Sequence, residues 1–495
     1  MIMTKKYDTN LWLEHIEKGI SMGPYSADWD SLSAFQPPEW FSGVKFGIFM
    51  HWGLYSVPAF NNEWYSRNMY IQGTPEFEHH IKTYGPQKDF GYKDFIPLFT
   101  AENFDPKEWI RLFKEAGARY IFPVAEHHDG FQMYRSELSH YNSYEMGPKR
   151  DIVGELKTSA EAEGLHFCTS SHRAEHWWFM GHGREFDSDI KEPMEFGDFY
   201  WPAMPEPDNF DMQSTPYPTE EYLTDWLIRT VEIIDRYSPE MLYFDWWIGH
   251  EAFKPYLTKL IAYYYNHGHA LGKRVAVCGK MEDLAFGCGI MEVERGGFAE
   301  AKAFPWQTDT AVARNSWCYT TSLDYKSSRE IIATLIDVVS RNGNLLLNIG
   351  PKADGTIPDG DKKILSDVGD WLKINGEAIH DSRVWRITQE GPTRDTEGAF
   401  SDGTEKTYSE EDIRFTVGHG CIYAFAMNYP ESGEILIRSI AKKDNGFSRA
   451  FYGIIDDVKI PGYEGPVEFE RREEGLHVKA AVSSPYPVVI KIITR

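Results

Sequence analysis

Eight short apolar runs alternate with helical patterns between residues 43 and 380, and this alternation limits the fold more than any other feature of the chain. Repeated strand–helix alternation is typical of β/α units with a parallel sheet. Eight such units predict a closed (β/α)8, or TIM, barrel. The expected strands span residues 44–50, 120–125, 166–170, 241–244, 275–278, 289–293, 306–310 and 344–349, the seventh being poorly patterned.

The helical patterns between these runs carry their own start and stop signals. Asp105 is followed by Pro106 and then by Glu108, which is the order typical of an N-cap and first helical turn. Apolar residues at three- and four-residue spacing follow, and Gly117 ends the pattern. Such stripes predict helices packed on the barrel and carry no functional information.

The pattern changes after Gly376 to short alternating segments separated by polar turns. This is typical of an antiparallel β-sandwich. The segments span residues 413–417, 422–427, 434–437, 467–470, 476–480 and 488–493. We therefore expect a catalytic β/α barrel domain over residues 1–382 and a C-terminal β-sandwich domain over residues 383–495.

Charge and cysteine usage exclude several classes of protein. The formal net charge of −24 repels nucleic acid and anionic membranes, so we expect neither as a partner. The five cysteines are odd in number and widely spaced, without a CxxC pair, which favours reduced thiols. The N-terminal stretch has no apolar signal-peptide core, so we expect a cytoplasmic protein. The sequence leaves open whether the chain forms a homo-oligomer.

Polar and aromatic residues follow one expected strand after another. Active sites of TIM barrels lie at the C-terminal ends of the strands, so these residues should meet on one rim. They are His51, Glu63 and Trp64 after the first strand, His127 and His128 after the second, His172 after the third, Asp245 after the fourth and Glu294 after the sixth.

Two carboxylates on such a rim, Asp245 and Glu294, suggest glycoside hydrolysis, in which one attacks the anomeric carbon and the other protonates the leaving oxygen. The alternative for Asp245 is a helix-capping role. A metal site is the competing hypothesis for the histidines. His172 and His176 lack the adjacent Glu of a zinc protease motif, and no pair has an evident third ligand. We expect no metal and no cofactor.

Several segments resemble family 29 of the glycoside hydrolases, the α-L-fucosidases. They read WFSGVKFGIFMHWGLYSVPAF, NEWY, AEHHDGF, YFDWW, ERGG and NLLLNIGPKADGTI, and the likeness spans about residues 35–385. The resemblance implies a retaining, exo-acting α-L-fucosidase that releases terminal fucose from oligosaccharides or glycoconjugates without a cofactor.

The resemblance also implies roles for individual residues. Asp245 matches the nucleophile, and Glu294 matches the region of the acid/base. Trp306 resembles an aromatic residue near the sugar. The residues that resemble fucose-holding positions are His51, Glu63, Trp64, His127 and His128, to which His172 on the same rim is added.

The chain departs from the family pattern in three places. Lys280 stands where many members have Arg, Gln307 stands where many have Glu, and the stretch SHRAEHWW replaces a simpler Tyr-containing loop. Glu63, Glu292 and Glu300 compete with Glu294 as the acid/base. Two other functions stay open: hydrolysis of a related sugar such as an α-L-galactoside, and fucose binding without catalysis.

Overall fold

A closed parallel barrel forms the larger part of the molecule. The computed structural model describes residues 6–208, 211–394 and 397–495. The sheet order is β1-β9-β8-β7-β6-β5-β4-β2-β3, and pairing of β1 with β2 closes the ring. The strands are β1 (Phe46–Met50), β2 (Tyr120–Glu126), β3 (His166–Phe167), β4 (Thr169–Ser171), β5 (Met241–Phe244), β6 (Ala276–Lys280), β7 (Ile290–Glu294), β8 (Trp306–Ala311) and β9 (Gly343–Ile349).

All eight expected barrel strands are present. The third is divided at Cys168 into β3 and β4, both of which pair with β2. The poorly patterned seventh is a complete six-residue strand, β8. Its polar residues obscure the strand pattern in the sequence, because Gln307 and Asp309 are buried inside the barrel rather than exposed.

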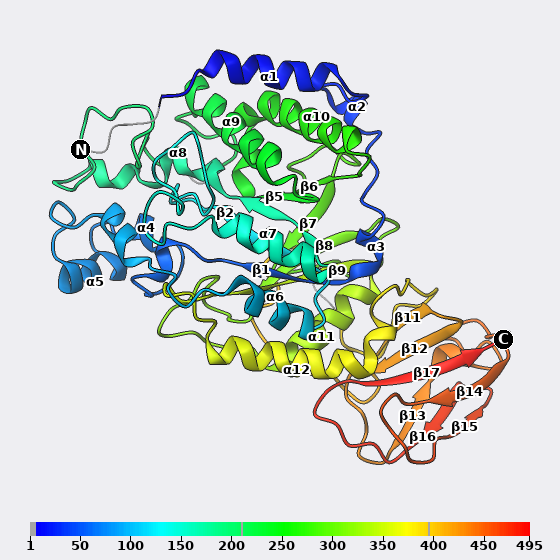
Figure 1. Ribbon diagram of the computed structural model, residues 1–495. Coiled ribbons are helices and arrows are strands. Elements are labelled where there is room, and N and C mark those ends of the chain that lie inside the picture. The colour runs from blue at the N-terminus through cyan, green and yellow to red at the C-terminus, as the bar shows by residue number, and fades with distance from the viewer. Residues whose placement is uncertain (1–5, 209–210, 395–396) are drawn as a thin grey trace.

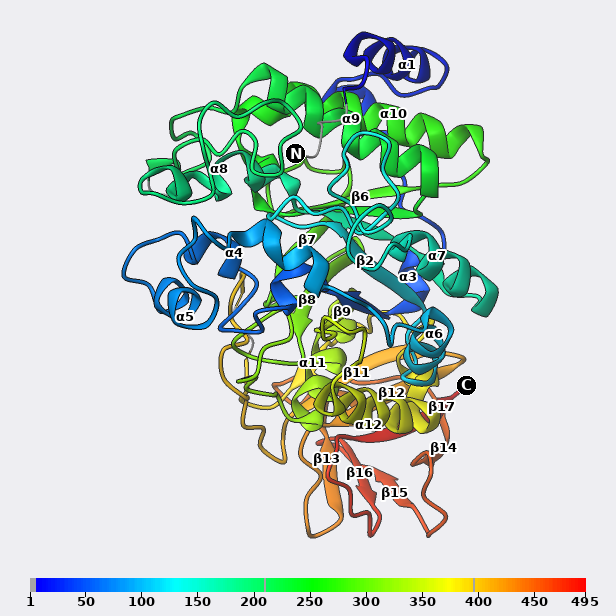
Figure 2. The ribbon, with the colours of Figure 1, turned by 60° about the vertical axis from the view of Figure 1, so that its left-hand side comes forward.

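Helices cover most of the barrel, as Figures 1 and 2 show. The expected cap of α6 is present, since the Asp105 carboxylate accepts hydrogen bonds from the backbone N–H groups of Lys107 and Glu108. Residues 281–289 and 295–305, which follow β6 and β7, contain turns instead of helices. The barrel helices are α6 (Pro106–Glu115), α7 (Ile152–Glu163), α9 (Glu220–Tyr237), α10 (Lys254–Ala270), α11 (Ser328–Ser340) and α12 (Asp359–Asn375).

Six further helices of the described residues lie outside this ring. The N-terminal α1 packs across α9 and α10 (Figure 1). Within the described residues, no helix combines the length and the apolar character needed to cross a bilayer. The outer helices are α1 (Thr9–Ser21), α2 (Trp29–Leu32), α3 (Phe41–Val44), α4 (Tyr65–Asn68), α5 (Pro75–Tyr84) and α8 (His176–Phe179).

The C-terminal part is a β-sandwich of two antiparallel sheets, as the alternating pattern predicts. One sheet has the order β10-β11-β12-β17-β14 and the other β13-β16-β15. Apolar side chains of both sheets form one core. The strands are β10 (Gln389–Glu390), β11 (Ile413–Gly418), β12 (Cys421–Ala426), β13 (Glu434–Ile437), β14 (Ile455–Lys459), β15 (Glu468–Arg471), β16 (Leu476–Lys479) and β17 (Val488–Thr494).

A buried ionic cluster joins the barrel to the sandwich. Asp337 of α11 accepts a hydrogen bond from Arg414 Nε of β11 at 2.5 Å and another from the Tyr408 hydroxyl at 2.6 Å. Arg341 directly follows this helix, and its guanidinium lies 3.3 Å from the Asp337 carboxylate. The Arg414 side chain is fully buried, so Asp337 supplies a counter-charge that water cannot replace.

We predict that Asp337→Ala lowers the free energy of unfolding by about 3–5 kcal/mol, because it leaves the buried Arg414 guanidinium without its carboxylate. Denaturant titration would measure this. Asp370→Ala is the control, since Asp370 makes an exposed pair with Lys373 on α12. The control substitution should lower the free energy of unfolding by at most about 1 kcal/mol. Equal effects of the two substitutions would contradict the role of the cluster.

Candidate active site

A cavity of about 270 Å³ opens at the C-terminal ends of the barrel strands. This is the end at which TIM barrels carry their active sites. Its lining combines carboxylates, imidazoles and aromatic rings, with room for about one sugar ring. The lining residues are His51, Glu63, Trp64, His127, His128, His172, Glu175, Tyr243, Asp245, Trp246, Glu294, Asp309, Trp317 and Phe400.

The predicted site residues all line this cavity with one exception, Trp306. Trp306 is the first residue of β8 and pairs with Gly343 at the start of β9, so it lies at the opposite end of the barrel. Its indole N–H donates to the Arg341 carbonyl, and its ring packs against Phe298. Its expected place near the sugar is therefore wrong.

Trp317 provides the aromatic wall instead. It lies in the loop after β8, where no periodic pattern marks it in the sequence. Its backbone N–H donates to Glu63 at 3.0 Å. The guanidinium of Arg295 lies 4.4 Å from the centre of its ring, and the His51 ring lies 5.2 Å from it.

Asp245 directly follows β5 and lies at the base of the cavity. Its Oδ2 is 3.1 Å from His172 Nδ1, and its Oδ1 accepts the Trp246 backbone N–H at 3.0 Å. The second bond caps a short 3-10 helix, Trp246–Gly249. Asp245 therefore both caps this helix and lines the cavity. Burial raises the pKa of Asp245, but His172 and Lys280 outweigh burial and hold this pKa well below its usual range. The carboxylate is therefore ionised.

Glu294 ends β7 on the other side of the cavity. Its Oε2 accepts the Trp246 indole N–H at 2.7 Å and lies 3.0 Å from Lys280 Nζ. Burial raises the pKa of Glu294 to about 7, with Asp245 adding to the rise against the opposing charge of Lys280. Two carboxyl groups in one cavity thus have pKa values displaced in opposite directions, which separates an ionised group from a protonated one.

Lys280 lies beneath both carboxyl groups, at the position where the sequence departs from the family's Arg. Its ammonium is 4.0 Å from Asp245, 2.9 Å from Glu292 and 3.5 Å from Asp309, in addition to Glu294. Burial lowers the Lys280 pKa, but these carboxylates outweigh burial and raise it well above its usual range. The group stays charged although it is fully buried.

The other candidate acids differ in position. Glu292 shares the inner face of β7 with Glu294, as expected for residues two apart in a strand. It is fully buried below the cavity, where its Oε1 accepts the Asp309 backbone N–H. Glu300 is exposed and does not line the cavity. Glu63 does line it, and burial raises the Glu63 pKa.

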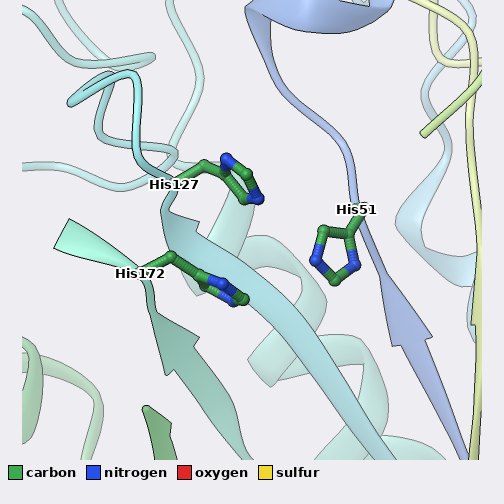
Figure 3. A group of neighbouring side chains, drawn as sticks. All are labelled: His51, His127 and His172. Atoms are coloured by element: carbon green, nitrogen blue, oxygen red, sulfur yellow. The ribbon is translucent and has the colours of Figure 1, made fainter. Parts of the chain in front are cut away.

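Three histidines converge from neighbouring strands, as Figure 3 shows for His51, His127 and His172. His51 Nδ1 is 2.7 Å from Asn348 Oδ1, which leaves Nε2 directed toward the other two rings. Burial lowers the pKa values of His51 and His127 well below the usual range. Each neutral imidazole offers one donor and one acceptor, which suits sugar hydroxyl groups.

The same three histidines are close enough to one another to share a metal ion. Their nearest nitrogens lie within 4.8 Å of one another, so the expectation that no third ligand exists is wrong. However, both ring nitrogens of His172 already have partners, Asp245 and Ser170. A metal ion would have to displace one of these hydrogen bonds, and we interpret the group as a hydroxyl-binding one.

His127 and His128 both face the cavity. Alternation to opposite faces would require the strand to continue, but β2 ends at Glu126. The two rings are 4.2 Å apart, and the His128 ring lies 3.5 Å from Asp245 Oδ2. Burial lowers the His128 pKa to about 4.

The stretch SHRAEHWW contributes His172 and Glu175 to the cavity, and its other residues form a buried scaffold behind them. Arg173 bonds Glu126 at 2.5 Å and Asp225 of α9 at 2.8 Å. His176 Nδ1 is 2.8 Å from the His128 carbonyl, so it holds the loop and does not line the cavity. Glu175 lines the cavity, 3.5 Å from His128, and burial raises its pKa well above the usual range. Sequence reasoning did not single out Glu175.

Comparison with known proteins gives a consistent result. A family model described as Alpha-L-fucosidase matches residues 13–377. Human plasma alpha-L-fucosidase is 29% identical over 465 residues, covering 91% of this chain and 87% of the relative. Rat tissue alpha-L-fucosidase is 30% identical over 437 residues, covering 85% and 83%. The crystal structure of Thermotoga maritima alpha-fucosidase in complex with fucose superposes with a TM-score of 0.73 at 30% identity, covering 95% of this chain and 100% of that one.

Proposed function

The chain belongs to the α-L-fucosidase family, and we propose that it releases terminal α-L-fucosyl residues by double displacement at Asp245 and Glu294. The observation that supports this most is that Asp245 and Glu294 line one cavity above a shared Lys280 ammonium, with their pKa values displaced in opposite directions. An ionised nucleophile and a protonated acid are what the first step requires.

In the first step, Asp245 attacks the anomeric carbon while the bond from that carbon to the aglycone oxygen breaks. Glu294 gives its proton to the departing oxygen, and a covalent fucosyl-enzyme forms. In the second step, Glu294 takes a proton from water, the water oxygen bonds to the anomeric carbon, and Asp245 leaves as a carboxylate. The protons and electron pairs return to their starting places.

The separation of the two carboxyl groups supports this route. Because Lys280 Nζ lies 4.0 Å from Asp245 Oδ1 and 3.0 Å from Glu294 Oε2, these oxygens are at most about 7 Å apart. Retaining enzymes need roughly 5–5.5 Å, and inverting enzymes about 6.5–9.5 Å to admit water. A separation of at most about 7 Å between these two oxygens is compatible with the retaining range.

The buried histidines would hold the fucose ring in this scheme. His51 and His127 are neutral and so exchange hydrogen bonds with hydroxyl groups without placing a positive charge beside the anomeric carbon. The small cavity supports exo action, in which only the terminal sugar enters.

We also propose that the protein works in a reducing, cytoplasmic environment. All five cysteines are buried and unpaired, which supports this proposal.

We predict net retention at the anomeric centre, since each of two displacements inverts it once. A proton NMR time course on an α-L-fucoside should show α-L-fucose first, with the β anomer appearing by later mutarotation. β-L-Fucose as the first product would refute the double displacement.

We predict that Asp245→Gly lowers turnover by several orders of magnitude, because no covalent intermediate can form. Azide fits the space that the carboxylate leaves, so it should partly restore the reaction of an activated fucoside and yield β-L-fucosyl azide. The control is Asp370→Gly, an exposed site on α12. Asp245→Gly with nearly unchanged turnover would remove the residue from this role.

We predict that Glu294→Ala cuts kcat/KM on a fucosyl disaccharide by about 10²–10⁴, but spares a dinitrophenyl fucoside, whose leaving group needs no proton. In the unaltered enzyme, the protonated acid is lost as pH rises through the Glu294 pKa of about 7, so kcat/KM should fall above that pH. Glu294→Ala should lose this alkaline limb.

Glu63→Ala is the matched comparison, because Glu63 is also buried in the cavity and also has a raised pKa. Glu63→Ala should lower kcat/KM on both substrates to the same extent and keep the fall of kcat/KM at alkaline pH. If Glu63→Ala instead shows the selective loss and Glu294→Ala does not, the acid role passes to Glu63.

A further inference from the structure

A segment from the C-terminal side of the chain, residues 397–402, lies across the barrel rim beside Glu294. The backbone N–H of Phe400 donates to the Glu294 carbonyl at 2.9 Å, and that of Ser401 donates to the Arg295 carbonyl at 2.8 Å. Gly398 exchanges two backbone hydrogen bonds with Gly297. The segment is thus fixed to the residues that carry and follow the catalytic acid.

The contact requires a close approach of the two backbones. A Cβ atom on Gly296 would lie 1.9 Å from the Gly398 carbonyl oxygen, so no other residue fits at Gly296. The segment is anchored a second time through Asp402, whose carboxylate accepts hydrogen bonds from Lys326 and Thr310. It is therefore a positioned part of the rim.

Phe400 is in an unusual conformation for its type. Its φ is +54°, in the left-handed region that bulky residues rarely occupy, and its side chain is 61% exposed. Such a conformation costs about 1–3 kcal/mol and persists where surrounding structure enforces it, often at ligand sites. Burial of the ring does not offset this cost. The strain instead presents an apolar ring to solvent at the mouth of the cavity.

Phe400 extends an aromatic surface that begins with Trp246. The two rings are stacked at 17° with their centres 6.2 Å apart. The Trp246 indole N–H also donates to Glu294 Oε2. The group that protonates the leaving oxygen therefore sits directly beside this pair of rings.

We propose that Phe400 and Trp246 form the subsite for the leaving group, and that it takes a neutral hexopyranoside whose C–H face stacks on the rings. This rests on the proposed function, because the leaving oxygen must lie next to Glu294 and the aglycone must continue from it. Aromatic faces cover the apolar side of a sugar ring. The carboxylates nearby and the net charge of −24 disfavour an anionic aglycone.

The test compares a substrate that fills this subsite with one that does not. A panel of α-L-fucosyl hexopyranosides of different linkage identifies the disaccharide that the unaltered enzyme cleaves best. α-L-Fucosyl fluoride is the reference, since fluoride is too small to reach the rings. Phe400→Ala should lower kcat/KM on the disaccharide about 2–13-fold and leave kcat/KM on the fluoride nearly unchanged.

Two further variants separate stacking from folding. Phe400→Gly removes the ring and suits the positive φ, so it should fold and repeat the selective loss. Phe400→Tyr keeps a ring and should retain activity on the disaccharide. Phe447→Ala, at an exposed aromatic of the sandwich, is the control and should change neither substrate.

Each remaining outcome has a definite meaning. Equal losses on both substrates would show that the segment only supports the site, and unchanged kinetics in all Phe400 variants would show that the ring does not bind the aglycone. Either result would overturn the inference and leave the fucosidase activity intact. Cleavage of neither substrate by the unaltered enzyme would instead refute the proposed function.

Discussion

One buried ammonium group, that of Lys280, organises the chemistry of this site. It lies within 4.0 Å of carboxyl groups on β7, β8 and the end of β5. A single positive charge cannot balance four ionised carboxyl groups in a low-dielectric interior, so some of them must stay protonated. The pKa values of Glu292 and Glu294 are raised, while that of Asp245 is lowered with help from His172. The distribution of protons therefore follows from the number of charges around Lys280.

The distribution of protons among these carboxyl groups depends on a rigidly placed His172, and the buried scaffold behind it provides this placement. Arg173 and Arg229 alternate with Glu126 and Asp225 in a buried network that joins β2, the loop after β4 and α9. Such pairs contribute little net stability relative to apolar packing, but removing one partner is costly. The network thus specifies one conformation of the loop and keeps the His172 ring against Asp245.

The sequence could predict the parts of the site that regular structure positions. Asp245 and Glu294 directly follow apolar runs, and parallel strands bring such positions to one rim. Trp317 and Phe400 escaped prediction because they lie on loops, where no periodicity links sequence to position. Trp306 was misplaced because its role came from the family resemblance alone, whereas the expected strand 306–310 begins at Trp306 and so puts it at the end of the barrel away from the rim. The polar strand β14 was missed because it lacks the alternation of a half-buried strand.

The electrostatic pattern also suits the charge that develops during the reaction. In glycoside hydrolysis, positive charge grows on the sugar ring as the leaving group departs. The imidazoles of His51, His127 and His128 have lowered pKa values, so in the proposed mechanism they would meet the sugar as neutral partners and add no repulsion. The ionised Asp245 lies on the same side of the cavity as these rings. Lys280 does not line the cavity whereas the ionised Asp245 does, so in the proposed mechanism Asp245 places a negative charge next to the sugar and would favour the transition state over the bound substrate.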